Sequence, residues 1–254
     1  MMKFRYLFLI VLLSFTRSVS AAEYGHIHLA APDTAVAAQW YVKHFGGTAS
    51  GFGGDTSSID RVAYGNIPVV FFQREPGEGS VGSGVDHIGF SMPDVAEKMQ
   101  AIIADGGKSL GDLVSFAGMT IGFVEDPWGT KIELIDDSDL RGMHHIHLSS
   151  PDPETTLQWY SNMFGGESDK FKGVLDGLFY GNVWLLVARA RGEIAPTMGR
   201  SMDHLGWNFD NLDEAAVMLK AKGINFTMEP RDYRGIRISF VDGPDGVRIE
   251  LVQY

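Results

Sequence analysis

His26-Ile27-His28-Leu29 and His145-Ile146-His147-Leu148 are two copies of one four-residue stretch, and this repeat decides the fold. The copies lie 119 positions apart (145 − 26). Further along, Asp86-His87-Ile88-Gly89 returns as Asp203-His204-Leu205-Gly206, 117 positions later (203 − 86). Glu133 has a counterpart at that same offset, Glu250. A repeat that preserves His, His and Glu in order preserves a candidate site as well as a fold.

Each copy divides into two smaller units. His26 and His87 both open short runs of alternating apolar and polar residues, a pattern typical of a strand with one buried face. An amphipathic helix is expected after each opening, ended by glycine. The helices are expected at 34–45, 94–104, 154–164 and 212–222. Further strands are expected at 61–64, 68–72, 120–124 and 131–135, and again at 177–180, 184–188, 237–241 and 248–252. The unit is therefore a strand, a helix and two or three more strands, used four times.

Charge and composition exclude several kinds of partner. The chain has 254 residues, with 21 basic and 32 acidic side chains and a net charge of −11. This balance argues against nucleic acid and anionic membranes as partners. The sequence contains no cysteine, so thiolate metal sites and disulfides are excluded.

The first 21 residues have the pattern of an export signal. Lys3 and Arg5 precede an apolar run at 6–15 that is too short to span a bilayer, and small residues at 19–21 suit a signal peptidase. The alternative is an N-terminal membrane anchor. A signal peptide at 1–21 predicts a periplasmic or secreted protein, with no stable membrane insertion after its removal. The loss of three of the 21 basic residues would leave a net charge of −14.

Four βαβββ modules that open with His-Ile or His-Leu, two of them closing with Pro-x-Gly-x-x-Ile-Glu-Leu, resemble the vicinal oxygen chelate superfamily. This superfamily includes glyoxalase I, bleomycin resistance proteins and extradiol dioxygenases. The resemblance implies an α+β fold in which the four modules pair into two half-barrel domains, assigned here to residues 22–140 and 141–254. Two complete pairs of modules in one chain are compatible with a monomer or a homodimer.

The resemblance also implies two divalent metal sites, each with two imidazoles and one carboxylate. Carried over in sequence order, the first domain would supply His26, His87 and Glu133, and the second His145, His204 and Glu250. Fe(II) is favoured by this donor set, and Mn(II), Zn(II) or Ni(II) could also occupy it. Three protein ligands leave open positions where two neighbouring substrate oxygens could bind.

His28 and His147 share a strand face with His26 and His145, about 6–7 Å further along the strand. We interpret them as catalytic residues that line the pocket and carry protons, with support of the metal ligands as the alternative. A second ligand to the same metal is possible at this distance but strained. Lys131 and Arg248 precede the glutamates by two residues. They could pair with the ligand carboxylate, contact an anionic substrate group or simply face solvent.

Departures from the family patterns bear on the reaction. The strand regions 68–73 and 183–187 contain no glutamate, which argues against the standard glyoxalase I ligand set and favours the dioxygenase-like one. The dioxygenase pattern is also incomplete, because Phe123 and Phe240 stand where a tyrosine is usual. The histidine expected upstream is missing from 114–119 and 231–236. A proton relay would then need His28 or His147.

Two classes of function remain. The first is a metal-dependent enzyme that acts on a small substrate with vicinal oxygens, by dioxygenase-like or glyoxalase-like chemistry. The second is a non-catalytic protein that sequesters a small molecule, as bleomycin resistance proteins do. Two complete ligand sets favour the enzyme, because a pure binder has no need to retain them.

The export signal can be tested on the purified protein. We expect the mature chain to begin at or near Ala22 and to be found outside the cytoplasm, because 19–21 offer the small residues that a signal peptidase reads. Intact-mass measurement and N-terminal sequencing check this. Membrane-bound protein that keeps residues 1–21 would support the membrane anchor instead.

Overall fold

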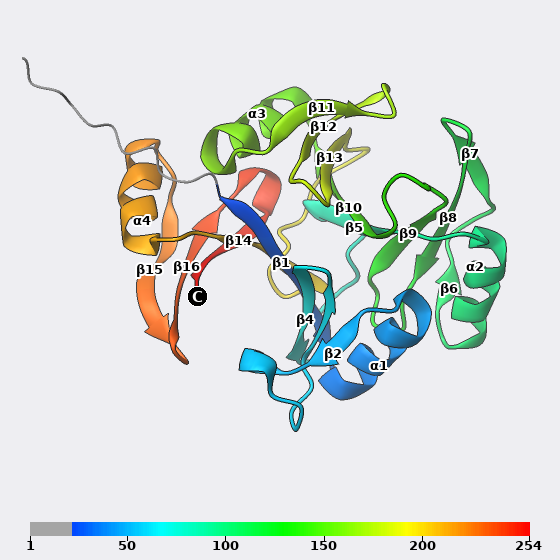
Figure 1. Ribbon diagram of the computed structural model, residues 1–254. Coiled ribbons are helices and arrows are strands. Elements are labelled where there is room, and N and C mark those ends of the chain that lie inside the picture. The colour runs from blue at the N-terminus through cyan, green and yellow to red at the C-terminus, as the bar shows by residue number, and fades with distance from the viewer. Residues whose placement is uncertain (1–21) are drawn as a thin grey trace, which may run out of the picture.

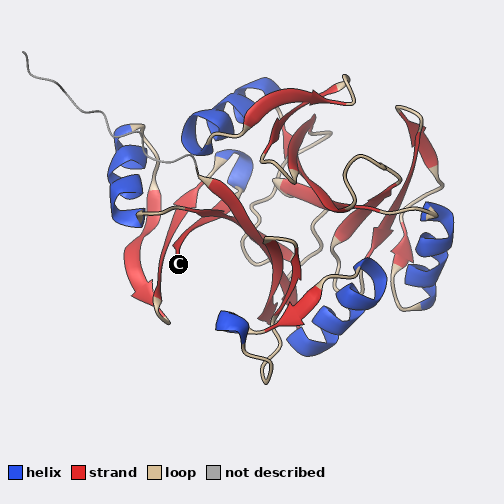
Figure 2. Ribbon diagram, viewed as in Figure 1, coloured by secondary structure: helices blue, strands red, loops and turns tan. Residues whose placement is uncertain are grey.

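The computed structural model describes residues 22–254, so the predicted signal peptide lies outside the described residues. Four helices and two large curved sheets make up an α+β fold, as expected, and the helices lie on the outer faces of the sheets (Figures 1 and 2). Each expected helix is present to within one residue at either end. The helices are α1 (Thr34–Phe45), α2 (Val95–Ala104), α3 (Pro153–Phe164) and α4 (Leu212–Ala221).

The first sheet has eight strands in the order β15-β16-β17-β14-β1-β4-β3-β2. Its strands are β1 (Glu23–Ala31), β2 (Thr48–Ser50), β3 (Arg61–Tyr64), β4 (Ile67–Gln73), β14 (Met202–Asn208), β15 (Phe226–Tyr233), β16 (Ile236–Asp242) and β17 (Arg248–Gln253). The C-terminal end of the chain lies inside the curve of this sheet (Figure 1).

The second sheet has nine strands. Eight follow the order β11-β12-β13-β10-β5-β9-β8-β6, and β7 pairs with β8. Its strands are β5 (Val85–Ser91), β6 (Lys108–Ser109), β7 (Val114–Phe116), β8 (Met119–Glu125), β9 (Lys131–Ile135), β10 (Gly142–Ser150), β11 (Glu167–Phe171), β12 (Leu175–Phe179) and β13 (Trp184–Arg189). The edge strands β2, β6, β7, β11 and β15 were not expected from the sequence, and they are short or mostly exposed.

Each sheet combines one module from each half of the sequence. The first sheet joins the first and fourth modules through the antiparallel pair β1–β14, and the second joins the second and third through β10–β5. Four modules thus form two half-barrels, as expected, but the modules that share a half-barrel differ from those that are paired within each sequence repeat. The domain boundary at residue 140 stays a sequence-based prediction, and the sheets run across it.

Local sequence features fix the helices against these sheets. The side chain of Asp33 accepts hydrogen bonds from the backbone N–H groups of Ala35 and Val36, and Asn211 caps α4 in the same way. The buried faces of the helices join one continuous core that includes Tyr41, Tyr160 and Trp207. No helix within 22–254 is long and apolar enough to cross a membrane.

A buried carboxyl distinguishes the two copies of the turn before the last strand. Asp126 accepts hydrogen bonds from the backbone N–H groups of Trp128 and Thr130 and from the Tyr41 hydroxyl at 2.8 Å. Its counterpart in the second copy is Gly243. Burial outweighs these hydrogen bonds and raises the pKa of Asp126 from 3.8 to about 6.

This raised pKa predicts a pH dependence of stability. The protonated form of Asp126 stabilises the folded state. Its contribution to the free energy of unfolding is full below the unfolded-state pKa of 3.8 and is lost as the pH rises through about 6. Between roughly pH 5 and pH 7.5, the free energy of unfolding of the wild type should therefore fall by about 1 kcal/mol relative to Asp126→Asn. Denaturant titrations of both proteins at several pH values measure this difference. Parallel curves would show that Asp126 is ionised throughout.

Candidate metal centres

Two buried groups of histidine and glutamate lie where the modules meet. Within each group, one ligand atom from every residue lies within 4.8 Å of one from every other residue. Cluster 1 contains His26, His28, His204 and Glu250. Cluster 2 contains His87, His145, His147 and Glu133. All eight residues that the sequence predicted as metal ligands or catalytic histidines belong to one of these clusters.

The clusters combine these residues differently from the sequence-order sets. His26 lies with His204 and Glu250, 2.9 Å from the glutamate, and not with His87 and Glu133. His145 correspondingly lies with His87 and Glu133. The predicted grouping was wrong because it paired modules that are adjacent in sequence, whereas the sheets join modules one and four, and two and three.

Strand register explains why these side chains meet. His28 lies opposite His204 in the antiparallel pair β1–β14, and His26 lies opposite Gly206. Gly206 is also the partner of Glu250 in the parallel pair β14–β17. The second sheet repeats this register in β10, β5 and β9. Three neighbouring strands therefore direct their donors to one point on the concave side of each sheet.

A glycine makes room for one ligand histidine in each cluster. A Cβ atom placed on Gly206 would lie 2.1 Å from Cε1 of His26, and one on Gly89 would lie 2.1 Å from Cε1 of His145. Such contacts are far shorter than van der Waals distance, so no other residue fits without displacing the ring. The glycine in the repeated Asp-His-x-Gly motif therefore serves the histidine of the neighbouring strand.

The aspartate of the same motif orients the second histidine. Asp203 lies 2.7 Å from Nδ1 of His204, and Asp86 lies 2.6 Å from Nδ1 of His87. An Nδ1–H that donates to a carboxylate leaves Nε2 as the free donor for a metal. Sequence analysis assigned no role to these aspartates, although the exact repetition of the motif was a signal. Arg248 and Lys131 pair with them, at 3.0 and 2.6 Å, and not with the ligand glutamates.

Burial sets the ionisation of the cluster. Burial lowers the pKa of His26 and, with nearby imidazoles, lowers that of His28 well below its usual range. For His204, burial also opposes the charge, but hydrogen bonds to Asp203 and Glu250 outweigh it and raise the pKa. Burial likewise opposes charge on Glu250, yet hydrogen bonds from His204 and His26 hold its pKa far below the usual value. The ionised carboxylate and the neutral rings of His26 and His28 suit a divalent cation, and the binding of an ion would displace any proton that His204 holds on Nε2.

The hydrogen bonding of the histidine ring nitrogens indicates whether the clusters can hold an ion. His28 Nδ1 is buried without a hydrogen-bond partner in the part of the chain that the structure describes, and Nε2 of His26 and of His145 faces only the cluster glutamate, at 2.9 and 3.6 Å. Buried polar atoms are normally paired, so nitrogens that converge on one carboxylate and have no other partner indicate a ligand. Four donors within 4.8 Å of one another fit around an ion bound at about 2.1 Å after slight contraction. His28 and His147 are thus near enough to act as fourth ligands, and their catalytic role remains a prediction.

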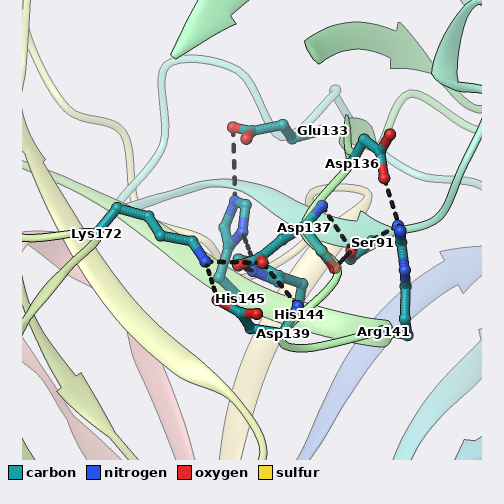
Figure 3. Close-up of polar contacts among 9 residues, drawn as sticks. All are labelled: Ser91, Glu133, Asp136, Asp137, Asp139, Arg141, His144, His145 and Lys172. Carbon is teal, nitrogen blue, oxygen red and sulfur yellow. Dashed lines mark hydrogen bonds and ion pairs between the residues drawn. The ribbon is translucent and has the colours of Figure 1, made fainter. Parts of the chain in front are cut away.

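Cluster 2 has an additional hydrogen-bonded chain behind it (Figure 3). Nδ1 of His145 lies 2.8 Å from Nδ1 of His144, whose Nε2 contacts Asp137 at 3.3 Å. Lys172 pairs with Asp137 at 2.8 Å. Strict alternation along β10 would point His144 away from the site, but a register shift between Met143 and His145 brings its ring against His145. Gly25 takes the place of His144 in cluster 1.

An open cavity of about 340 Å³ lies over cluster 1. His26, His28, His204 and Glu250 form part of its wall, and the remainder is largely aromatic, aliphatic and arginine side chains. This volume suits a small molecule. A buried donor set beneath such a cavity can hold an ion and present its open positions to a ligand.

Comparison with known proteins identifies the family. The model of the Glyoxalase/Bleomycin resistance protein/Dioxygenase superfamily matches residues 23–134 and 142–251. The chain belongs to this superfamily. This result confirms the resemblance to vicinal oxygen chelate proteins that the repeated motifs indicated.

Individual relatives are more distant. The chain is 25% identical over 181 residues to a probable chloroplastic lactoylglutathione lyase of Arabidopsis thaliana, a match that covers 65% of this chain and about half (52%) of the plant protein. It is 27% identical over 121 residues to a lactoylglutathione lyase of Salmonella typhimurium, covering 43% of this chain and 90% of that protein. Glyoxalase I from Zea mays has the same fold, with a TM-score of 0.69 at 19% identity and 92% coverage of both chains.

Metal content tests the clusters and their regrouping. We expect about two equivalents of divalent metal per chain, with one lost in His204→Ala and the other in His87→Ala, because two or three remaining donors hold an ion far more weakly. The double variant His26→Ala, His204→Ala should lose one equivalent, whereas His26→Ala, His87→Ala should lose both. Elemental analysis of purified proteins distinguishes these results. The opposite pattern in the double variants would restore the sequence-order grouping.

Proposed function

We propose that the protein is a divalent-metal-dependent enzyme that acts on a small substrate with two adjacent oxygen atoms. Cluster 1 is its active centre. The observation that carries the proposal is the placement of three imidazoles and one ionised carboxylate in the wall of an open 340 Å³ cavity. A structural metal site needs no such cavity, because its coordination is closed by the protein.

Each residue of cluster 1 has a definite task in this proposal. His26, His204 and Glu250 would hold the ion, Fe(II) by preference, and a bound ion would act as a Lewis acid on the chelating oxygens. Asp203 fixes the ring of His204 through its 2.7 Å contact with Nδ1. Phe72 and Phe240 contact the histidine rings, at centroid distances of 4.4 Å from His28 and 5.1 Å from His204, and help to exclude water.

We propose His28 as the residue that moves the proton. Its Nδ1 is buried and has no hydrogen-bond partner within 22–254, and burial keeps the ring neutral by lowering its pKa. A neutral imidazole beside the substrate can accept a proton. Phe240, which stands where a tyrosine is usual, cannot.

The residues of β4 bear on the class of reaction. The strand reads Ile67-Pro68-Val69-Val70-Phe71-Phe72-Gln73, and Val70 and Phe72 line the cavity. No carboxylate from this strand can serve as ligand or base. This supports dioxygenase-like chemistry, whereas the lyases among the matched relatives support glyoxalase-like chemistry as the second candidate.

We further propose that the enzyme acts in the periplasm or is secreted. This proposal rests on the pattern of residues 1–21 alone.

Turnover by the metal-loaded protein tests the function. Metal-free protein is reloaded with Fe(II), Mn(II), Zn(II) or Ni(II), and is then assayed for oxygen uptake with catechols and for conversion of lactoylglutathione. We expect activity in one of these two assays. That activity should be reduced at least ~10²-fold in His204→Ala, because a metal ion acting as a Lewis acid contributes several kcal/mol. His87→Ala, the matched change in cluster 2, should retain it. Tight binding without turnover for any metal would favour the sequestration protein.

The role of His28 has its own test. With a substrate in hand, His28→Gln should lower kcat by ~10²–10⁴, the usual contribution of a positioned acid or base, while metal content stays unchanged. His147→Gln is the matched control and should leave kcat unaltered. Loss of metal from His28→Gln would identify His28 as a fourth ligand instead.

A further inference from the structure

The surroundings of the two clusters can be compared position by position because the sheets repeat each other: the first cleft is the cavity over cluster 1, and the second cleft is the corresponding region over cluster 2. Phe52 and Phe171 are related by the offset of 119, and Arg234 and Ala117 by the offset of 117. Register supplies another pair. Arg61 pairs with Val70, the neighbour of His28, as Gly177 pairs with Leu186, the neighbour of His147. Each cleft thus serves as an internal control for the other.

Two arginines meet at the mouth of the first cleft. The guanidinium carbons of Arg61 and Arg234 lie 5.3 and 4.6 Å from the centroid of the Phe52 ring, within the range of cation–π attraction. Both line the cavity over cluster 1. Arg61 is held by Asp60 at 2.7 Å, with 16% of its side chain exposed. Arg234 follows β15 in a tight turn with φ 49° and is exposed, so its guanidinium can adjust to a ligand.

The second cleft has no cations at these positions. A Cβ atom on Gly177 would lie 2.7 Å from Leu186, so the space that Arg61 occupies in the first cleft is already filled. Phe171 is contacted by Phe116 and Trp184, at centroid distances of 6.2 and 5.7 Å. The positions that line the first cavity are packed together here as an apolar group. That group contains Ile121, Ile135, Phe171 and Leu186, with Phe116, Met119, Phe123, Leu175 and Trp184 against it.

The charges around the first cleft would sum to a positive value with a divalent ion bound. A divalent ion held by Glu250 would leave one net positive charge, while Arg61 pairs with Asp60, and Arg74 and Arg248 share Asp203. Arg234 takes part in no ion pair within 22–254 and adds a second positive charge. The whole chain carries −11, so this cleft contrasts with its surroundings. A cleft with a net positive charge concentrates anionic ligands.

We infer that Arg61 and Arg234 form an anion-binding subsite at the mouth of the first cleft. The substrate is then a small organic acid that carries a carboxylate at one end and adjacent oxygens at the other. Arg61 and His28 stand two strand spacings apart, about 9–10 Å between Cα atoms, which leaves room for one ring or a short chain between the two groups. Arginine suits this role because its planar guanidinium group binds a carboxylate through two parallel hydrogen bonds. The inference rests on the proposed chelation of adjacent oxygens at cluster 1.

A pair of probes that differ only in the carboxylate tests the subsite. Catechol and 3,4-dihydroxybenzoate both offer adjacent oxygens, and their dissociation constants are measured by calorimetry on the metal-loaded protein. We expect 3,4-dihydroxybenzoate to bind at least ~10-fold more tightly, since a charge-assisted hydrogen bond contributes more than a neutral one. Arg61→Gln and Arg234→Gln should each reduce this preference, and the double variant should abolish it. All three variants should bind catechol as the wild type does.

Controls separate this inference from the function on which it rests. Arg191→Gln removes the same charge from an exposed loop and should preserve the preference. Equal affinity for the two probes, or a preference that survives in the double variant, would overturn the anion subsite. Binding of catechol would still support the proposed chelation at cluster 1. If neither probe binds, both the anion subsite and the proposed chelation at cluster 1 are overturned. Lost catechol binding in His204→Ala, but not in His87→Ala, places the probes at cluster 1.

Discussion

The close approach of a histidine ring to a glycine in the next strand is the contact on which both sites depend. His26 lies over Gly206 and His145 over Gly89, so near that a single added carbon would lie 2.1 Å from the ring. Because the glycine has no side chain, the ring can lie across the neighbouring strand, beside the two strands that carry the remaining donors. The same strand pairs, β1–β14 and β10–β5, hold the half-barrels together. Folding of each half-barrel and assembly of its donors are therefore one event.

Duplication preserved the donors and changed what surrounds them. Both clusters have three imidazoles, one glutamate and an aspartate that orients a histidine. Their openings differ because Arg61 and Arg234 of one cleft are replaced by Gly177 and Ala117 in the other. The first cleft is an open cavity of about 340 Å³ that the two arginines help to line. The other is filled by an apolar group around Phe171. The ligand sets alone would suggest two equivalent active sites, whereas the difference between the two clefts favours a single active site at cluster 1.

Several functional assignments depended on contacts that strand position could not specify. Contact with the ligand glutamates was one expectation for Lys131 and Arg248, but they pair with Asp86 and Asp203. Strict alternation along the strand would place His144 on the far face, but it contacts His145 where the register shifts. Alternation along a strand predicts a face, whereas a bulge or a long flexible side chain changes which neighbour is reached.

The sequence by itself determined the modules, their helices and the donor types, because hydrophobic periodicity, caps and repeated motifs are local. It also identified all eight residues of the two clusters. Tertiary structure decided which residues share a cluster, since the four opening strands have nearly the same pattern and any two could pair by local rules. It also decided that Gly206 serves His26 and that one cleft is open. These results depend on contacts between strands of different modules, such as His26 with Gly206, 180 positions apart (206 − 26), and His145 with Gly89, 56 positions apart (145 − 89), which no local pattern encodes.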